Sequence, residues 1–180
     1  RHVRSEAWAM QFVQLPGERK KEEFFMYFSA GIDTSYSQQS PDTIAISFLG
    51  ITNKGRCVVL DEKVYNNAAL EIPLAPSDTV RNIVDFLDRN KKKWGLARNA
   101  FLDTADQATM QEWNKYKRRN GCVYTLNNAW KQMEIIDRIN AQLGWMAYDD
   151  AADIEPCFYV LDSCPNYITE LETYSWREDK

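Results

Sequence analysis

Short apolar runs separated by turn-forming residues dominate the first third of the chain. Residues 24–32 form one continuous apolar and aromatic run, which is typical of a strand buried on both faces. Residues 43–52 and 57–62 have a similar character, and the Asn-Lys-Gly sequence at 53–55 between them favours a tight turn. Three consecutive strands with short connections predict an antiparallel meander.

Helical spacing replaces this pattern in the middle of the chain. Apolar residues recur every three or four positions over 80–87, which predicts a helix that is capped by Ser77 and ends by Gly95. A second helix is expected with Asp106 as its N-cap and Arg119 at its end. The remaining predicted elements are strands at 100–102, 122–124 and 158–161, and helices at 130–143 and 165–174.

This order of elements indicates a mixed α/β fold that is flanked by helices. Three antiparallel strands come first, and crossover units then add parallel strands to the same sheet. The tryptophans mostly fall at core spacings, and the helix at 130–143 is expected to bury its apolar side chains. These side chains are Trp130, Met133, Ile136, Ile139 and Leu143.

Composition narrows the possible chemistry. The 180 residues suit a single domain over 1–180, and no apolar run approaches the ~20 residues that span a bilayer, so we expect no membrane contact. The single histidine, His2, argues against Ser-His-Asp and Cys-His mechanisms. Four cysteines without a CxxC pair indicate reduced core thiols rather than zinc ligands. Any catalysis is therefore expected to depend on Asp and Glu, with or without a metal.

Asp33 and Asp103 share one context, because each follows a predicted buried strand. A right-handed crossover lays the strand at 100–102 parallel to an earlier one. If that neighbour is the strand at 24–32, the two carboxyl ends lie about 4.8 Å apart across the ladder. Carboxylates there repel each other unless a cation joins them, and Mg²⁺ or Mn²⁺ is the hard ion for such a site. This arrangement suits two-metal phosphodiester cleavage.

Structural roles for the acidic residues stay open at this point. An Asp that follows a buried strand also serves in Asx turns and helix caps. Asp42 is expected to act in a turn or cap and Asp106 to cap its helix, while the acidic residues at 148–150 and 153 are expected to form a solvated loop.

Three basic clusters interrupt a chain whose formal net charge is 22 − 26 = −4. They lie at 19–21, at 91–93 with Arg98, and at 115–119. Either of two interpretations explains them: contact with a phosphate backbone, or cations at the last turns of helices, where the helix dipole favours them.

Several segments resemble a known family through their order and spacing. They are Ala-Gly-Ile-Asp-Thr-Ser-Tyr-Ser at 30–37, Pro-Asp-Thr-Ile-Ala at 41–45, Phe-Leu-Asp-Thr-Ala-Asp at 101–106, Lys131, and residues 169–176. Together they resemble the C-terminal nuclease domain of tailed-phage terminase large subunits. The resemblance covers residues 24–176.

This resemblance implies an RNase H-like fold and a metal-dependent endonuclease that cuts concatemeric double-stranded DNA during viral genome packaging. It implies that Asp33 and Asp103 are catalytic ligands for Mg²⁺ or Mn²⁺, with two ions in a complete site. It also implies the portal and the small terminase subunit as partners and the cytoplasm of an infected bacterium as the location. The family's ATPase motor is a separate N-terminal domain, so a chain that begins with Arg1 is expected to be a fragment.

One acidic motif of the family is not found in the sequence up to Lys180. The third acidic residue lies in an Asp-x-x-Asp-Ala motif after the Glu-Leu-x-x-Tyr segment, and we expect it beyond Lys180 rather than at Asp179. Three alternatives remain: a junction-resolvase or transposase-type nuclease of the same fold, a non-catalytic RNase H-like docking module, and an unrelated metal-free α/β binding protein. In the last alternative, Asp33 and Asp103 lie far apart.

Overall fold

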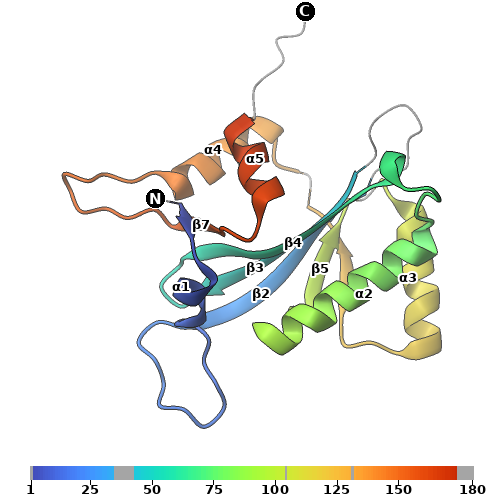
Figure 1. The fold of residues 1–180 in the computed structure, drawn as a ribbon, viewed down its shortest axis with the longest axis horizontal. Coiled ribbons are helices and arrows are strands. Elements are labelled where there is room, and N and C mark those ends of the chain that lie inside the picture. The colour runs from blue at the N-terminus through green and yellow to red at the C-terminus, as the bar shows by residue number, and fades with distance from the viewer. Residues whose placement is uncertain (1, 35–42, 104, 131, 174–180) are drawn as a thin grey trace, which may run out of the picture.

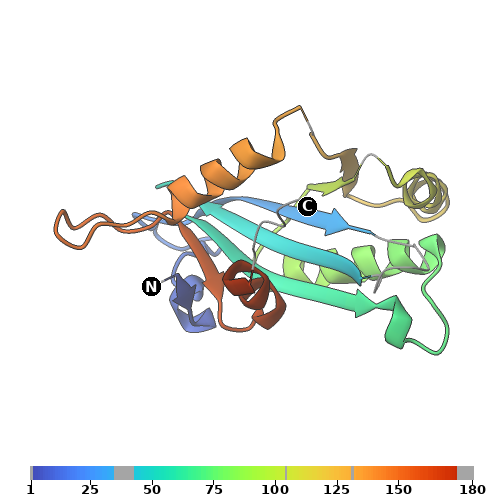
Figure 2. The ribbon, with the colours of Figure 1, turned by 90° about the horizontal axis from the view of Figure 1, so that it is seen from above.

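A mixed sheet forms the centre of the molecule in a computed structural model, which describes residues 2–34, 43–103, 105–130 and 132–173. Within these residues, seven strands pair in the order β1-β7-β4-β3-β2-β5-β6. Helices lie on both faces of the sheet (Figures 1 and 2). The predicted fold class is therefore confirmed.

The centre of the sheet is the predicted antiparallel meander. Strands β2 (Phe25–Asp33), β3 (Thr43–Thr52) and β4 (Cys57–Asn66) pair in sequence order. Gly55 turns the chain between β3 and β4 with a positive φ of 84°, which glycine adopts readily. Strand β4 extends four residues past the predicted end, because its last residues pair with the start of β3.

Parallel strands extend the sheet on both sides of this meander. Strand β5 (Asn99–Leu102) pairs with β2, and β6 (Thr125–Asn128) pairs with β5. On the other side, β7 (Phe158–Leu161) pairs with β4 and β1 (Val3–Arg4) pairs with β7.

The strand predicted at 122–124 is wrong, because Tyr124 serves the core instead of the ladder. Its side chain is 1% exposed, and its phenol donates a hydrogen bond to Asp88. Pairing begins one residue later, where the N–H of Thr125 donates to the carbonyl of Arg98 over 2.8 Å.

Two helical layers enclose the sheet. Helices α1 (Glu6–Met10) and α2 (Pro76–Lys93) lie below the sheet in Figure 1, and α3 (Gln107–Asn120) lies beside α2 at the right. Helices α4 (Ile135–Met146) and α5 (Pro165–Thr173) lie above the sheet. The short 3-10 helix η1 (Asn67–Ala69) leads into α2. Every helix of the described residues is too short or too polar to cross a lipid bilayer.

The lower layer holds the main core. Rings from β2, β3 and α2 follow one another in a line: Phe25 and Phe28 have centroids 5.4 Å apart, Phe28 and Phe48 5.7 Å, and Phe48 and Phe86 6.4 Å. The chain leaves α2 at Gly95, which lies so close to the ring of Phe28 that a Cβ atom would collide with it. Such contacts fix α2 firmly against the sheet.

Two expectations about helix starts and burial are wrong. The N-cap of α2 is Ala75 rather than Ser77, because Pro76 takes the first helical position, where its missing N–H costs nothing. Helix α4 begins at Ile135 rather than at 130, and it contains no buried residue. Side chains expected in the core are instead exposed, with Ile139 partly covered. The exposed ones are Trp130, Met133, Ile136 and Leu143, and Trp145 joins them.

All four cysteines are unpaired. Cys57 and Cys164 are buried, as expected of core thiols, whereas Cys157 is exposed and Cys122 is partly buried. Burial raises the pKa of the Cys57 thiol to about 11 and that of Cys164 to about 12, so both stay protonated at neutral pH.

Candidate metal centre

The parallel pairing of β2 with β5 brings Asp33 and Asp103 to the same edge of the sheet. The last paired residues are Ile32 and Leu102. Asp33, the last residue of β2, and Asp103, the first residue after β5, come directly after this pair. The strand pairing expected from the crossover is confirmed, and the two aspartates do not lie at distant parts of the sheet. Carboxyl ends of strands at such an edge are the usual ligand-binding positions of open α/β sheets.

The turn after β5 orients Asp103. Its Oδ1 atom accepts a hydrogen bond from the N–H of Ala105 over 2.9 Å, and its carbonyl accepts from the N–H of Asp106 over 3.1 Å. This is the Asx turn that the sequence left open as a structural role. Asp103 therefore forms an Asx turn and also lies at the sheet edge. The turn holds its Oδ1 atom in a defined direction.

Asp106 caps helix α3, as predicted. Its Oδ1 atom accepts from the N–H of Thr109 over 2.9 Å. Its Oδ2 atom accepts from the hydroxyl of Thr34, the residue that follows Asp33. The loops after the two strands are therefore joined by a side-chain hydrogen bond.

A groove of about 380 Å³ opens on the upper face of the sheet beside Asp33, and Glu62 and Glu170 also line it. Glu62 already has a structural task, because its carboxylate accepts hydrogen bonds from the N–H groups of Asn166 and Tyr167, each over 2.8 Å. It thereby anchors the first turn of α5, where backbone N–H groups lack helical partners. No local sequence signal marks Glu62 for this role, since Asn166 is 104 residues away.

The side chains that the register brings to this edge offer carboxylate oxygens, which are the donor type that hard divalent cations prefer. Two carboxylates match the way proteins commonly hold Mg²⁺, which keeps several waters and takes further oxygens from substrate phosphates. Within the described residues, no group of three His, Cys, Asp or Glu side chains could hold a metal ion. Asp42, Lys131 and Asp179 lie outside the described residues.

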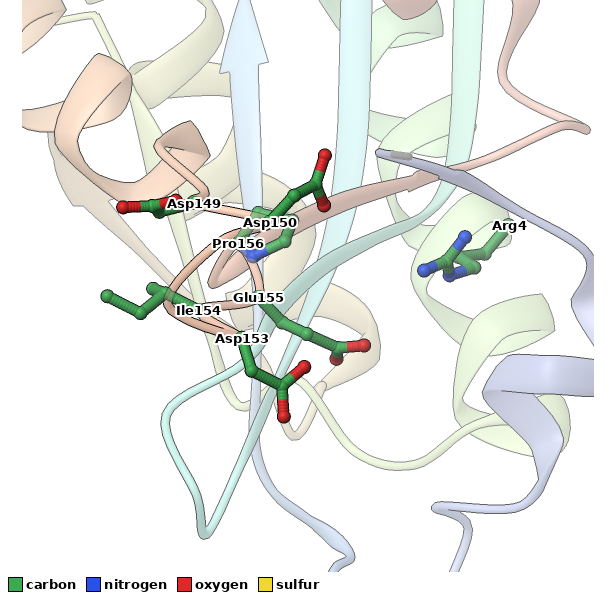
Figure 3. Close-up of a pocket in the computed structure, with 7 residues that line it drawn as sticks. All are labelled: Arg4, Asp149, Asp150, Asp153, Ile154, Glu155 and Pro156. Atoms are coloured by element: carbon green, nitrogen blue, oxygen red, sulfur yellow. The ribbon is translucent and has the colours of Figure 1, made fainter.

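The acidic loop after α4 forms an exposed hairpin away from this edge. Asp149 and Ile154 pair their backbones through hydrogen bonds of 3.0 and 2.8 Å. Beside the hairpin lies a hollow of about 410 Å³, and Figure 3 shows Asp149 pointing away from Arg4, which directs its guanidinium toward the hairpin. The acidic residues are exposed, so the expectation of a solvated loop is confirmed.

The basic clusters at 91–93 and 115–119 occupy the last turns of α2 and α3. Helix α3 starts beside the carboxylate edge and runs back toward the opposite end of the sheet, a length of about 21 Å at 1.5 Å per residue over its 14 residues. Helix α2 likewise ends just before β5 begins. This location favours the helix-dipole interpretation of both clusters. In the remaining cluster, at 19–21, the Lys21 ammonium donates hydrogen bonds to the carbonyls of Gln11 and Val13 over 3.0 and 2.7 Å, beside the end of α1.

Solved structures provide an independent comparison. No family model and no curated protein sequence matches this chain. Crystal structures of the large terminase from the thermophilic bacteriophage D6E do match, one with a TM-score of 0.63 and one in complex with ADP with a TM-score of 0.62, both at 15% identity. Each match covers 98% of this chain, which spans about 35% of the length of the terminase chain. Over nearly its whole length, this chain therefore has the fold seen in phage large terminase structures.

Proposed function

We propose that this chain is the nuclease module of a viral DNA-packaging terminase, a Mg²⁺- or Mn²⁺-dependent endonuclease that acts on double-stranded DNA. The observation that carries the proposal is the register of β2 on β5, which sets Asp33 and Asp103 side by side at one sheet edge. The fold shared with the D6E large terminase supports the same assignment.

The two aspartates are the proposed metal ligands. Their adjacent carboxylates repel each other without a cation, which favours binding of a divalent ion between them. A cation held there would polarise the phosphodiester and lower the pKa of a bound water. The Asx turn at Asp103 keeps one ligand oriented while the other lies exposed at the end of β2.

The remaining assignments follow from the same proposal. The substrate is a DNA concatemer, the partners are a portal and a small terminase subunit, and the reaction takes place in the cytoplasm of an infected bacterium. A third acidic ligand from beyond Lys180 would complete a two-ion site.

Plasmid nicking in Mn²⁺ tests the proposal. We expect nicking by the chain extended beyond Lys180 and a loss of about 100-fold or more in Asp33→Asn and in Asp103→Asn, because outer-shell changes alone cost 10–100-fold at such sites. Asp153→Asn in the exposed hairpin is the matched control and keeps full activity. Full activity in both edge variants would exclude these residues from the mechanism.

A metal titration separates the nuclease from the non-catalytic docking module. Binding of Mn²⁺ to the folded state raises the melting temperature as the ion concentration rises. We expect this shift in the original chain and its loss in Asp33→Asn. A melting temperature that does not respond to Mn²⁺ or Mg²⁺ would favour the docking module, and a preference for branched DNA would favour a junction resolvase.

A further inference from the structure

The hydrogen bond between Thr34 and Asp106 connects the two loops that carry the proposed ligands. Thr34 follows Asp33 directly, and Asp106 lies three residues after Asp103. Backbone pairing between β2 and β5 ends at Ile32 and Leu102, one residue before each aspartate. The Thr34 hydroxyl donates to Asp106 Oδ2 just beyond this point, where backbone pairing no longer holds the two segments together.

Asp106 is anchored on a rigid element. Its other oxygen, Oδ1, accepts from the N–H of Thr109 in the first turn of α3. Thr109 is 0% exposed and Trp113, one turn further on, is 2% exposed, so α3 is packed tightly against the core at this end. Both carboxylate oxygens of Asp106 therefore accept hydrogen bonds from protein donors, which fix the direction of this side chain.

We infer that Thr34 and Asp106 form a brace that sets the separation of the Asp33 and Asp103 carboxylates and thereby the affinity of the centre for its divalent cation. The inference rests on the proposed function. Repulsion between the two ligand carboxylates pushes the strand ends apart when no cation lies between them. A hydrogen bond to a charged acceptor opposes that movement, since such bonds are shorter and stronger than neutral ones.

Two variants remove the brace and keep the local fold. Thr34→Val replaces the hydroxyl with a methyl group of similar size. Asp106→Ser keeps an N-cap of comparable quality, because Ser and Asp rank together at this position, but the shorter side chain no longer reaches Thr34. Thr34→Ser restores a hydroxyl and is the rescue variant.

Calorimetric titration with Mn²⁺ is the deciding measurement. We expect Thr34→Val and Asp106→Ser each to weaken Mn²⁺ binding about tenfold, within the range known for outer-shell partners, while Thr34→Ser binds as the original chain does. The double variant should bind no more weakly than the single ones, because both remove the same bond. Loss of the hydrogen bond should lower the melting temperature of Thr34→Val without metal. A purely structural role would produce the same decrease and leave the Mn²⁺ affinity unchanged, so the affinity decides between the two roles.

Asp33→Asn in the same titration separates the two hypotheses. If it abolishes binding while Thr34→Val binds like the original chain, the brace is overturned and the metal centre stands. If Thr34→Ser binds as weakly as Thr34→Val, the hydroxyl is not the active feature and the brace is overturned as well. If Asp33→Asn binds Mn²⁺ normally, the proposed function itself fails, and the brace fails with it.

Discussion

Helices α2 and α4 lie on opposite faces of the same sheet and differ completely in burial. Both carry apolar side chains at helical spacing. Helix α2 buries the side chains of Val80, Ile83, Val84, Phe86 and Leu87, whereas α4 buries none of its residues. Helical periodicity thus identifies an apolar face, but it does not say whether the fold provides a surface to cover that face.

The reason for the difference is where each helix crosses the sheet. Helix α2 runs beneath the central strands, so that Phe86 packs edge-on against Phe48 in β3. Helix α4 contacts β7, near the edge of the sheet, and lies above the sheet in Figure 1. On the upper face, the central strands border an open groove that Asp33 and Glu62 line together with apolar residues such as Val64.

A matched pair of isoleucines tests the comparison directly and gives the largest expected effect. Ile83 in α2 is 0% exposed and Ile136 in α4 is 46% exposed. We expect Ile83→Ala to lower the free energy of unfolding by about 2–5 kcal/mol through lost burial and a cavity. Ile136→Ala should change it by about 0.5 kcal/mol or less. Urea unfolding measures both, and equal losses would mean that α4 is covered in solution.

The anchoring of α5 provides the next largest effect. Helix α5 lies on the same face as α4 but is tied to the sheet by the Glu62 carboxylate. We expect Glu62→Ala to destabilise the chain by about 1–2 kcal/mol, the cost of losing a strong helix cap. Amide hydrogen exchange should rise in α5 and stay unchanged in α2. Glu71→Ala, at an exposed position before α2, is the control and should have no effect.

Tyr124 offers a smaller, pH-dependent test of the lower layer. Burial, followed by the hydrogen bond to Asp88, raises the pKa of its phenol above the ordinary value of 10. The folded state therefore keeps a proton that the unfolded state loses above pH 10, so this contribution is present below pH 10 and is lost as pH rises further.

Tyr124→Phe should cost about 1 kcal/mol at pH 7, the net contribution of one hydrogen bond, because Asp88 is exposed and regains water. The free energy of unfolding should then fall less steeply between about pH 10 and 12. Part of the decrease should remain, because the pKa values of Tyr65, Tyr159 and Tyr167 are also raised. Urea unfolding across this pH range measures the effect. An unchanged slope would show that Tyr124 already ionises as it does in the unfolded chain.

Thiol alkylation gives the smallest perturbation, since it needs no mutation. Cys57 and Cys164 lie in the core with raised pKa values, and Cys157 is exposed beside the acidic hairpin. We expect iodoacetamide at pH 7.5 to modify Cys157 first and to reach Cys57 and Cys164 only on unfolding. Peptide mass spectrometry over time measures the order, and early labelling of Cys164 would contradict the packing of β7 against β4.

Local patterns predicted the elements that local forces determine. The meander, the Gly55 turn, the Asp106 cap and the end of α3 before Gly121 all depend on residues a few positions apart. The alignment of Asp33 with Asp103 was also predictable, because handedness and strand adjacency restrict how a crossover returns to the sheet.

The features that sequence patterns missed depend on distant partners. Tyr124 was expected in a strand, but its contact with Asp88 on α2 removes it from the ladder. Trp130 and Ile136 were expected in the core, but their side chains are 64% and 46% exposed. Glu62 was expected only as the last residue of a strand. Its role as acceptor for the first N–H groups of α5 depends on the docking of that helix.

A short stretch of chain joins Gly95 to the carboxylate edge. Only Leu96, Ala97 and Arg98 separate it from the first residue of β5, and Asp103 comes eight residues after it. A Cβ atom at position 95 would collide with the ring of Phe28 in β2, so glycine lets the chain pass this close to β2 on its way into β5. A larger residue there would have to displace either the Phe28 ring or the segment that leads into β5 and, through it, toward Asp103.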